Sequence, residues 1–264
     1  MVIIFFSIKK DTFFLLISFL FFMGIIVTSY HLWIGLITIL LCLIFLYIGN
    51  VANRFLLSLF IAFLFSFFLF QLTTNVLNTY DLSREAKILI NRCLLLLILI
   101  VVYITHKLQK KQISFYLQKP EFNNIIEFPF HSIKTSYFLL IGLIINVSIF
   151  VPFIVKENVI YLKSTFVFSL LFSLVNATLE ELIWRGILLD SLKRYMSVLY
   201  AIIITSVGFG LLHLSIGISL LVSLLFSFGG LFYAFVVLKT NSIYPAIFFH
   251  FVINMGMVWS GWIL

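Results

Sequence analysis

The run TFFLLISFLFFMGIIVT at residues 12–28 has no charged side chain and, at about 1.5 Å of rise per residue, crosses most of a bilayer as a helix. Similar runs recur along the 264-residue chain, which is 63% hydrophobic and only 10% charged. These fractions lie far outside those of soluble domains, and no long polar segment separates the runs. The sequence therefore predicts one all-α membrane domain, a polytopic bundle of transmembrane helices.

Polar clusters, turn residues and charges divide the apolar runs into eight or nine spans. The first division is the weakest, because only residues 29–31 interrupt the apolar sequence there. With nine spans, the expected segments are Thr12 to Thr28, Leu32 to Gly49, Phe55 to Leu72, Ile88 to Thr105, Ser136 to Val155, Ser164 to Leu189, Ser197 to Leu214, Ile216 to Leu238 and Ile243 to Leu264.

The distribution of lysine and arginine predicts the orientation, since basic residues accumulate in cytoplasmic loops. With the N-terminus inside, the inner loops receive Lys9, Lys10, Arg54, Lys107, Lys110, Lys111, Lys119, Lys134, Lys193, Arg194 and Lys239, and the outer loops receive Arg84, Lys87, Arg92, Lys156 and Lys163. The excess favours the N-terminus in and the C-terminus out. The formal net charge of +8 therefore indicates contact with anionic lipid headgroups rather than nucleic-acid binding.

The longest polar stretch, residues 106–135, divides the chain into two parts. It is basic, contains two prolines and is expected to be a cytoplasmic connection, with an interfacial helix near Ile113 to Leu117. Residues 1–135 hold the N-terminal spans and this loop, with no chemistry that the sequence identifies. Residues 136–264 hold the polar groups described next.

Ionisable side chains inside predicted spans are costly, at about 2.5–3.5 kcal/mol each, and so indicate function. In the second part, three spans carry such groups or a polar amide: Glu180, Glu181, Arg185, His213, His250 and Asn254.

Helical spacing groups these residues. Glu181 lies four residues before Arg185, and His250 lies four before Asn254, so each pair shares a helix face. Glu180 lies about 100 degrees around the helix from Glu181 and needs another partner. A second carboxylate beside the first and near imidazoles is a candidate general base. The alternative for Glu181 and Arg185 is an ion pair that only fixes helix packing.

Three short motifs carry a family resemblance. Glu180-Glu181-Leu182-Ile183-Trp184-Arg185, Phe209-Gly210-Leu211-Leu212-His213 and His250-Phe251-Val252-Ile253-Asn254 resemble the E-E-x-x-x-R, F-x-x-x-H and H-x-x-x-N signatures of the CAAX protease and bacteriocin-processing (Abi) family of intramembrane endopeptidases. The resemblance covers roughly residues 165–258, and Trp184 stands where Phe is more usual.

The resemblance implies roles for these residues. Glu180 and His213 would hold and deprotonate the attacking water, and His250 and Asn254 would stabilise the oxyanion. Glu181 and Arg185 would orient the others. Zinc held by Glu180, His213 and His250 stays open, because the family is commonly classed as metalloproteases. Asn254 favours a water activated directly by side chains, since an amide is a poor zinc ligand and a good oxyanion donor.

The resemblance thus implies an endopeptidase in a cell membrane of prokaryotic type, cleaving small peptides or membrane-associated proteins. The resemblance extends to peptide processing and bacteriocin self-immunity. Two other classes stay open: a transporter or proton relay that uses the same acids and imidazoles, and a catalytically silent immunity or scaffold protein.

Overall fold

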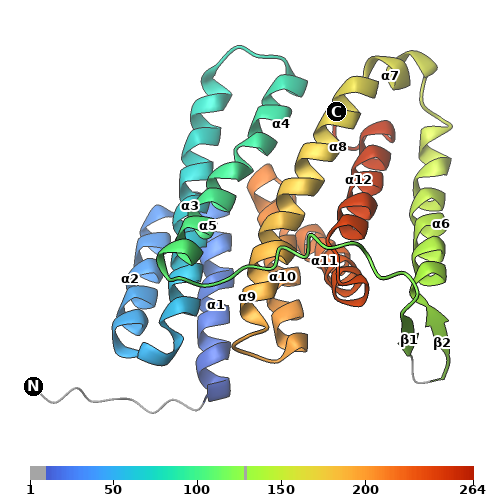
Figure 1. Cartoon of the computed structure of the whole chain (residues 1–264). Helices are drawn as coiled ribbons and strands as arrows, with labels where there is room; N and C mark the ends of the chain where they lie inside the picture. The colour runs from blue at the N-terminus through green and yellow to red at the C-terminus, as the bar shows by residue number, and fades with distance from the viewer. Residues whose placement is uncertain (1–9, 128–129) are drawn as a thin grey trace, which may run out of the picture. The chain divides into compact units, whose positions relative to one another are not determined.

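The computed structural model describes residues 10–127 and 130–264 and is almost entirely helical there (Figure 1). The helices are α1 (Lys10–Ser29), α2 (Trp33–Gly49), η1 (Val51–Asn53), α3 (Arg54–Thr79), α4 (Arg84–Cys93), α5 (Leu95–Leu108), α6 (Thr135–Ile154), α7 (Val159–Ser164), α8 (Phe166–Glu181), η2 (Leu182–Leu189), α9 (Asp190–Leu192), α10 (Val198–Leu212), η3 (His213–Ile216), α11 (Leu220–Thr240) and α12 (Tyr244–Trp259). The strands β1 (Ile125–Glu127) and β2 (Ser132–Lys134) form one antiparallel hairpin.

The all-α, multi-pass membrane architecture is confirmed. Within the described residues, seven helical segments are long and apolar enough to cross a bilayer, and α2 and α12 are shorter apolar helices. These segments correspond one to one with the nine expected spans. The inside location of the N-terminus stays a prediction, and Lys9, which contributes to it, lies outside the described residues.

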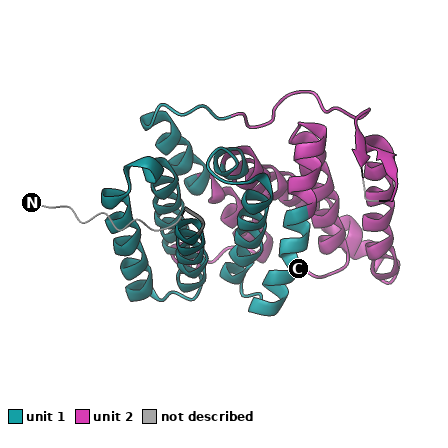
Figure 2. Ribbon diagram, turned by 90° about the horizontal axis from the view of Figure 1, so that it is seen from below, with its two compact units in different colours: residues 1–73, 97–113, 188–231 teal, residues 74–96, 114–187, 232–264 magenta. Residues whose placement is uncertain are grey.

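The helices form two compact units, each assembled from separated stretches of sequence (Figure 2). The first unit comprises residues 1–73, 97–113 and 188–231. Within it, α1 packs against α2 and α10. Its interior is aromatic: the Phe21 ring stacks on Phe60 with centroids 4.3 Å apart and meets the edge of Phe63 at 5.2 Å.

The second unit comprises residues 74–96, 114–187 and 232–264, and here α8 packs against both α4 and α12. The α12 helix also packs against α6, closely enough that a Cβ on Gly256 would collide with the Phe150 ring. At the end of α12, the Tyr161 hydroxyl of α7 donates to the Val258 carbonyl at 2.8 Å. These contacts fix α8 between two helices that carry polar side chains.

The predicted interfacial helix near Ile113 to Leu117 is wrong. Phe115 and Tyr116 have φ angles of 52° and 50°, and this left-handed backbone cannot continue a right-handed helix. The segment is instead a turn whose Tyr116 carbonyl accepts a hydrogen bond from the Ile243 amide at 2.8 Å. The short β1–β2 hairpin later in the same loop was also not predicted.

Candidate active site in the second unit

The site is built around the end of α8, where two glutamates close the helix. Glu180 and Glu181 are its last residues, and the chain continues in the wider π-helical turn η2, which carries Arg185. Such π segments are rare and often lie at functional sites, because they turn side chains away from the positions that an α-helix would give them. Both carboxylates and the guanidinium are buried, none of the three residues being more than 1% exposed.

Glu181 accepts the strongest contacts of the site. Arg185 donates through Nη1 to Glu181 Oε1 at 2.9 Å, the pair that their four-residue spacing predicts. His250 Nδ1 lies 2.9 Å from the same oxygen. Because a carboxylate only accepts hydrogen bonds, Nδ1 must carry the proton, which fixes the orientation of the imidazole ring.

Glu180 points to different partners. Its Oε1 lies 3.6 Å from Nη1 of Arg92, which comes from α4, and its Oε2 lies 3.7 Å from His250 Nε2. The same Arg92 nitrogen donates to Asn176 Oδ1 at 3.4 Å, and Asn176 lies one turn before Glu180 on α8. Each of the two acids therefore has its own arginine, and the imidazole of His250 faces both.

Helix α12 presents His250 and Asn254 one turn apart, both buried. The amide nitrogen of Asn254 has no hydrogen-bond partner among the described residues. A buried donor without a partner is costly, at about 1–3 kcal/mol, and such a group in a native protein needs an explanation. A bound substrate oxygen would satisfy it.

Tyr233 of α11 closes the cluster with its aromatic face. Its ring stacks on the His250 ring with centroids 4.9 Å apart, and the Arg185 guanidinium carbon lies 5.2 Å from the ring centroid. This is within cation–π distance. The ring thus restrains the imidazole and the guanidinium by packing against both.

His213 belongs to the first unit, at the first residue of η3. There α10 gives way to a tighter turn that ends at Gly217, whose φ is 87°. The half-buried His213 ring stacks on Phe226 at 4.3 Å, and its Nδ1 lies 3.0 Å from the Phe209 carbonyl oxygen. The helix thus breaks at Gly217, whose left-handed backbone ends the turn.

The donor set within the second unit does not fit a resident metal ion. No group of three His, Cys, Asp or Glu side chains in residues 10–127 and 130–264 is arranged to hold one. Glu180 Oε1 lies beside a guanidinium and His250 Nδ1 is used on Glu181, which leaves Glu180 Oε2 and His250 Nε2, fewer than the three protein ligands of a catalytic zinc site.

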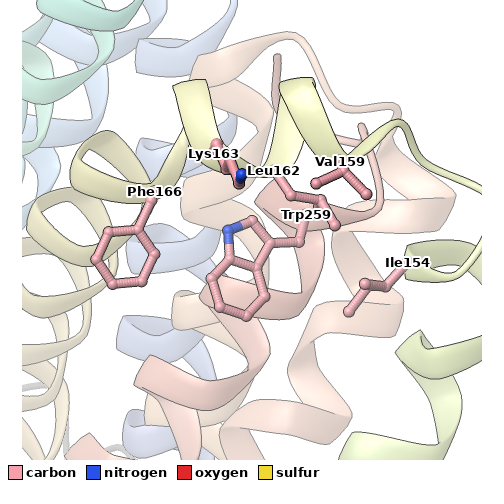
Figure 3. Close-up of a pocket in the computed structure, with 6 residues that line it drawn as sticks. All are labelled: Ile154, Val159, Leu162, Lys163, Phe166 and Trp259. Atoms are coloured by element: carbon pink, nitrogen blue, oxygen red, sulfur yellow. The ribbon is translucent and has the colours of Figure 1, made fainter.

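A hollow of about 450 Å³ lies elsewhere in this unit, lined by Ile154, Val159, Leu162, Lys163, Phe166 and Trp259 (Figure 3). Its walls are apolar apart from the Lys163 ammonium and the indole nitrogen of Trp259. None of the acids or imidazoles described above lines it. The hollow is therefore separate from the buried polar cluster.

Comparison with known families bears on these residues. Residues 162–256 match the family model described as Type II CAAX prenyl endopeptidase Rce1-like. The match confirms the resemblance to the CAAX protease family. It includes Glu180 through Asn254 and supports a membrane-embedded peptidase, while the first four spans lie outside it. No curated protein and no solved structure matches the chain.

Three residues of the cluster were missed from the sequence: Arg92, Asn176 and Tyr233. Arg92 was counted with the outer loops, although it lies inside the predicted span Ile88 to Thr105, and that position was a usable signal. Asn176 lies four residues before Glu180, so helical spacing alone places it on the same face. Tyr233 lies in an apolar run with no polar neighbour, and nothing in the sequence distinguishes it.

Proposed function

We propose that this protein is an intramembrane endopeptidase of the glutamate type, in which Glu180 activates the attacking water. The observation that carries the proposal is the asymmetry between the two buried acids. Oε1 of Glu181 accepts from both Arg185 and His250 at 2.9 Å, whereas the ionic contacts of Glu180 with Arg92 and His250 are longer, at 3.6 and 3.7 Å. Oε2 of each acid has no hydrogen-bond partner among the described residues, but only in Glu180 does Oε2 face His250 Nε2. Oε2 of Glu180 is therefore suited to accept a proton from a water molecule.

In the proposed reaction, the water oxygen bonds to the scissile carbonyl carbon while Glu180 takes a proton from the water. The resulting oxyanion accepts a hydrogen bond from the Asn254 amide and a second from Nε2 of His250, in the imidazolium form of the ring that carries a proton on both nitrogens, with Nδ1 donating to Glu181. The C–N bond then breaks as the proton passes from Glu180 to the leaving amine. The family pattern adds His213 as a second group acting on the water.

The proposed substrates are small peptides or membrane-associated proteins, since a membrane-embedded cluster acts on bonds presented at or within the bilayer. Peptide processing and bacteriocin self-immunity in a prokaryotic plasma membrane are the roles that the family suggests. Nothing in the cluster selects one sequence.

The test is made with purified protein in liposomes that contain candidate membrane peptides, with products identified by mass spectrometry. The proposal expects new peptide termini with wild-type protein and about 100-fold slower formation of them with Asn254→Ala at equal folded amounts. Uptake driven by an ion gradient without cleavage would instead show that the acids and imidazoles serve a transporter.

A further inference from the structure

Arg92 is a buried arginine that the family match does not include. It lies in the last turn of α4, is only 9% exposed, and its Nη1 lies 3.6 Å from Glu180 Oε1. A long charged side chain is almost never buried unless it is paired, because its desolvation costs several kcal/mol. Its position therefore needs a reason beyond solubility or topology.

The guanidinium of Arg92 is held from both ends. Nη1 also donates to Asn176 Oδ1 at 3.4 Å, and Nη2 donates to Asn91 Oδ1 at 2.6 Å. Asn91 in turn donates through Nδ2 to the Thr74 hydroxyl at 2.9 Å. This chain of contacts from α3 through α4 to α8 restricts the guanidinium to one orientation, with Nη1 toward Glu180.

The charges of the cluster are matched one to one. Arg185 pairs with Glu181, which leaves Arg92 as the guanidinium beside Glu180. Since Arg92 meets Oε1, the other oxygen of the same carboxylate, Oε2, is left toward His250. One oxygen is anchored, and the second is available for chemistry.

We propose that Arg92 is a positioning residue of the peptidase reaction: it fixes the Glu180 carboxylate through Oε1 so that Oε2 meets the attacking water. This inference rests on the proposed function. Under this proposal, a residue from positions 1–135, where the sequence showed no motif, helps to align the general base. Misplacing a reacting group by about 1 Å costs on the order of 100-fold in rate, so the effect is measurable.

The test compares peptide cleavage by wild type, Arg92→Lys, Arg92→Met and Arg92→Ala, with Arg84→Gln as the matched control. Arg84 lies on the same helix, is exposed and donates to the Ile263 carbonyl at 3.1 Å, so it shares the helix without touching the cluster. Equal amounts of folded, monodisperse protein are assayed, and kcat and KM are measured separately.

The expected result is a loss of about 100-fold in kcat for Arg92→Met and Arg92→Ala, with KM little changed. Arg92→Lys should retain intermediate kcat, and added methylguanidinium should partly restore kcat to Arg92→Ala but not to Glu180→Gln. Arg84→Gln should match wild type.

Wild-type kcat in folded Arg92→Met would overturn the proposal. A loss that follows the folded fraction alone, with no rescue by methylguanidinium, would reduce Arg92 to a structural ion pair. If wild type and Arg84→Gln are themselves inactive on all peptides, the proposed function fails and this inference fails with it.

Discussion

Replacing Arg185 with alanine should lower the free energy of unfolding of the second unit by about 3–5 kcal/mol, because it strands a buried carboxylate. Glu181 and Arg185 are both 0% exposed, and the Nη1–Oε1 distance is 2.9 Å. Without the guanidinium, Glu181 Oε1 keeps the hydrogen bond from His250 Nδ1 at 2.9 Å but loses its charged partner. The cation–π contact with Tyr233 is lost as well.

This magnitude corresponds to a drop of more than 100-fold in the ratio of folded to unfolded protein. The assay is the yield of monodisperse protein after detergent extraction, together with the midpoint of thermal unfolding. Arg84→Ala is the control, since Arg84 is an exposed arginine of the same unit. It should leave both quantities close to wild type.

A double variant distinguishes the cost of a stranded charge from the cost of lost side-chain packing. Arg185→Met combined with Glu181→Gln removes both charges at nearly constant volume, so it should recover most of the yield. Activity should stay low, because the glutamine at position 181 no longer offers His250 Nδ1 a charged carboxylate. Wild-type yield and unfolding midpoint for Arg185→Ala would refute the claim that this buried pair stabilises the fold.

Three further predictions address the oxyanion, the metal and the topology. Asn254→Ala should lower kcat by about 100-fold, or about 3 kcal/mol, at an unchanged unfolding midpoint, and an unchanged kcat would remove it from the oxyanion site. Activity should survive strong chelators, and one tightly held zinc per active chain by elemental analysis would contradict the direct mechanism. A reporter fused after Lys119 should stay cytoplasmic and one fused after Leu264 should be exported, and export of the first would reverse the assigned orientation.

The helical spans were predictable because each depends on a local property, the length of an apolar run, and no packing partner is needed to recognise one. Each expected segment therefore overlaps an apolar helix of the structure, although α3 runs on to Thr79, past the expected end at Leu72, and α12 ends at Trp259, before the expected end at Leu264. The loop at residues 113–117 was mispredicted for the opposite reason. Its conformation depends on the Tyr116 carbonyl reaching Ile243, more than a hundred residues away, and local composition carries no trace of that contact.

The site shows the same division. The pairing of Glu181 with Arg185 follows from four-residue spacing, and the need of Glu180 for another partner follows from helix geometry. That the partner is Arg92 depends on how α4 packs against α8, which the sequence does not encode locally. The wide turn of η2 after the glutamates was likewise not predictable from the apolar run that forms it.

The central claim, that Glu180 is the base, is tested most directly by comparing Glu180→Gln with Glu181→Gln in the peptide-cleavage assay. Glutamine preserves volume and polarity but cannot accept the proton as a carboxylate does. With folded amounts equalised, Glu180→Gln should lose about 100-fold or more in kcat. Wild-type cleavage by Glu180→Gln with loss in Glu181→Gln would show that the two acids have exchanged roles, and full activity in both would contradict the mechanism.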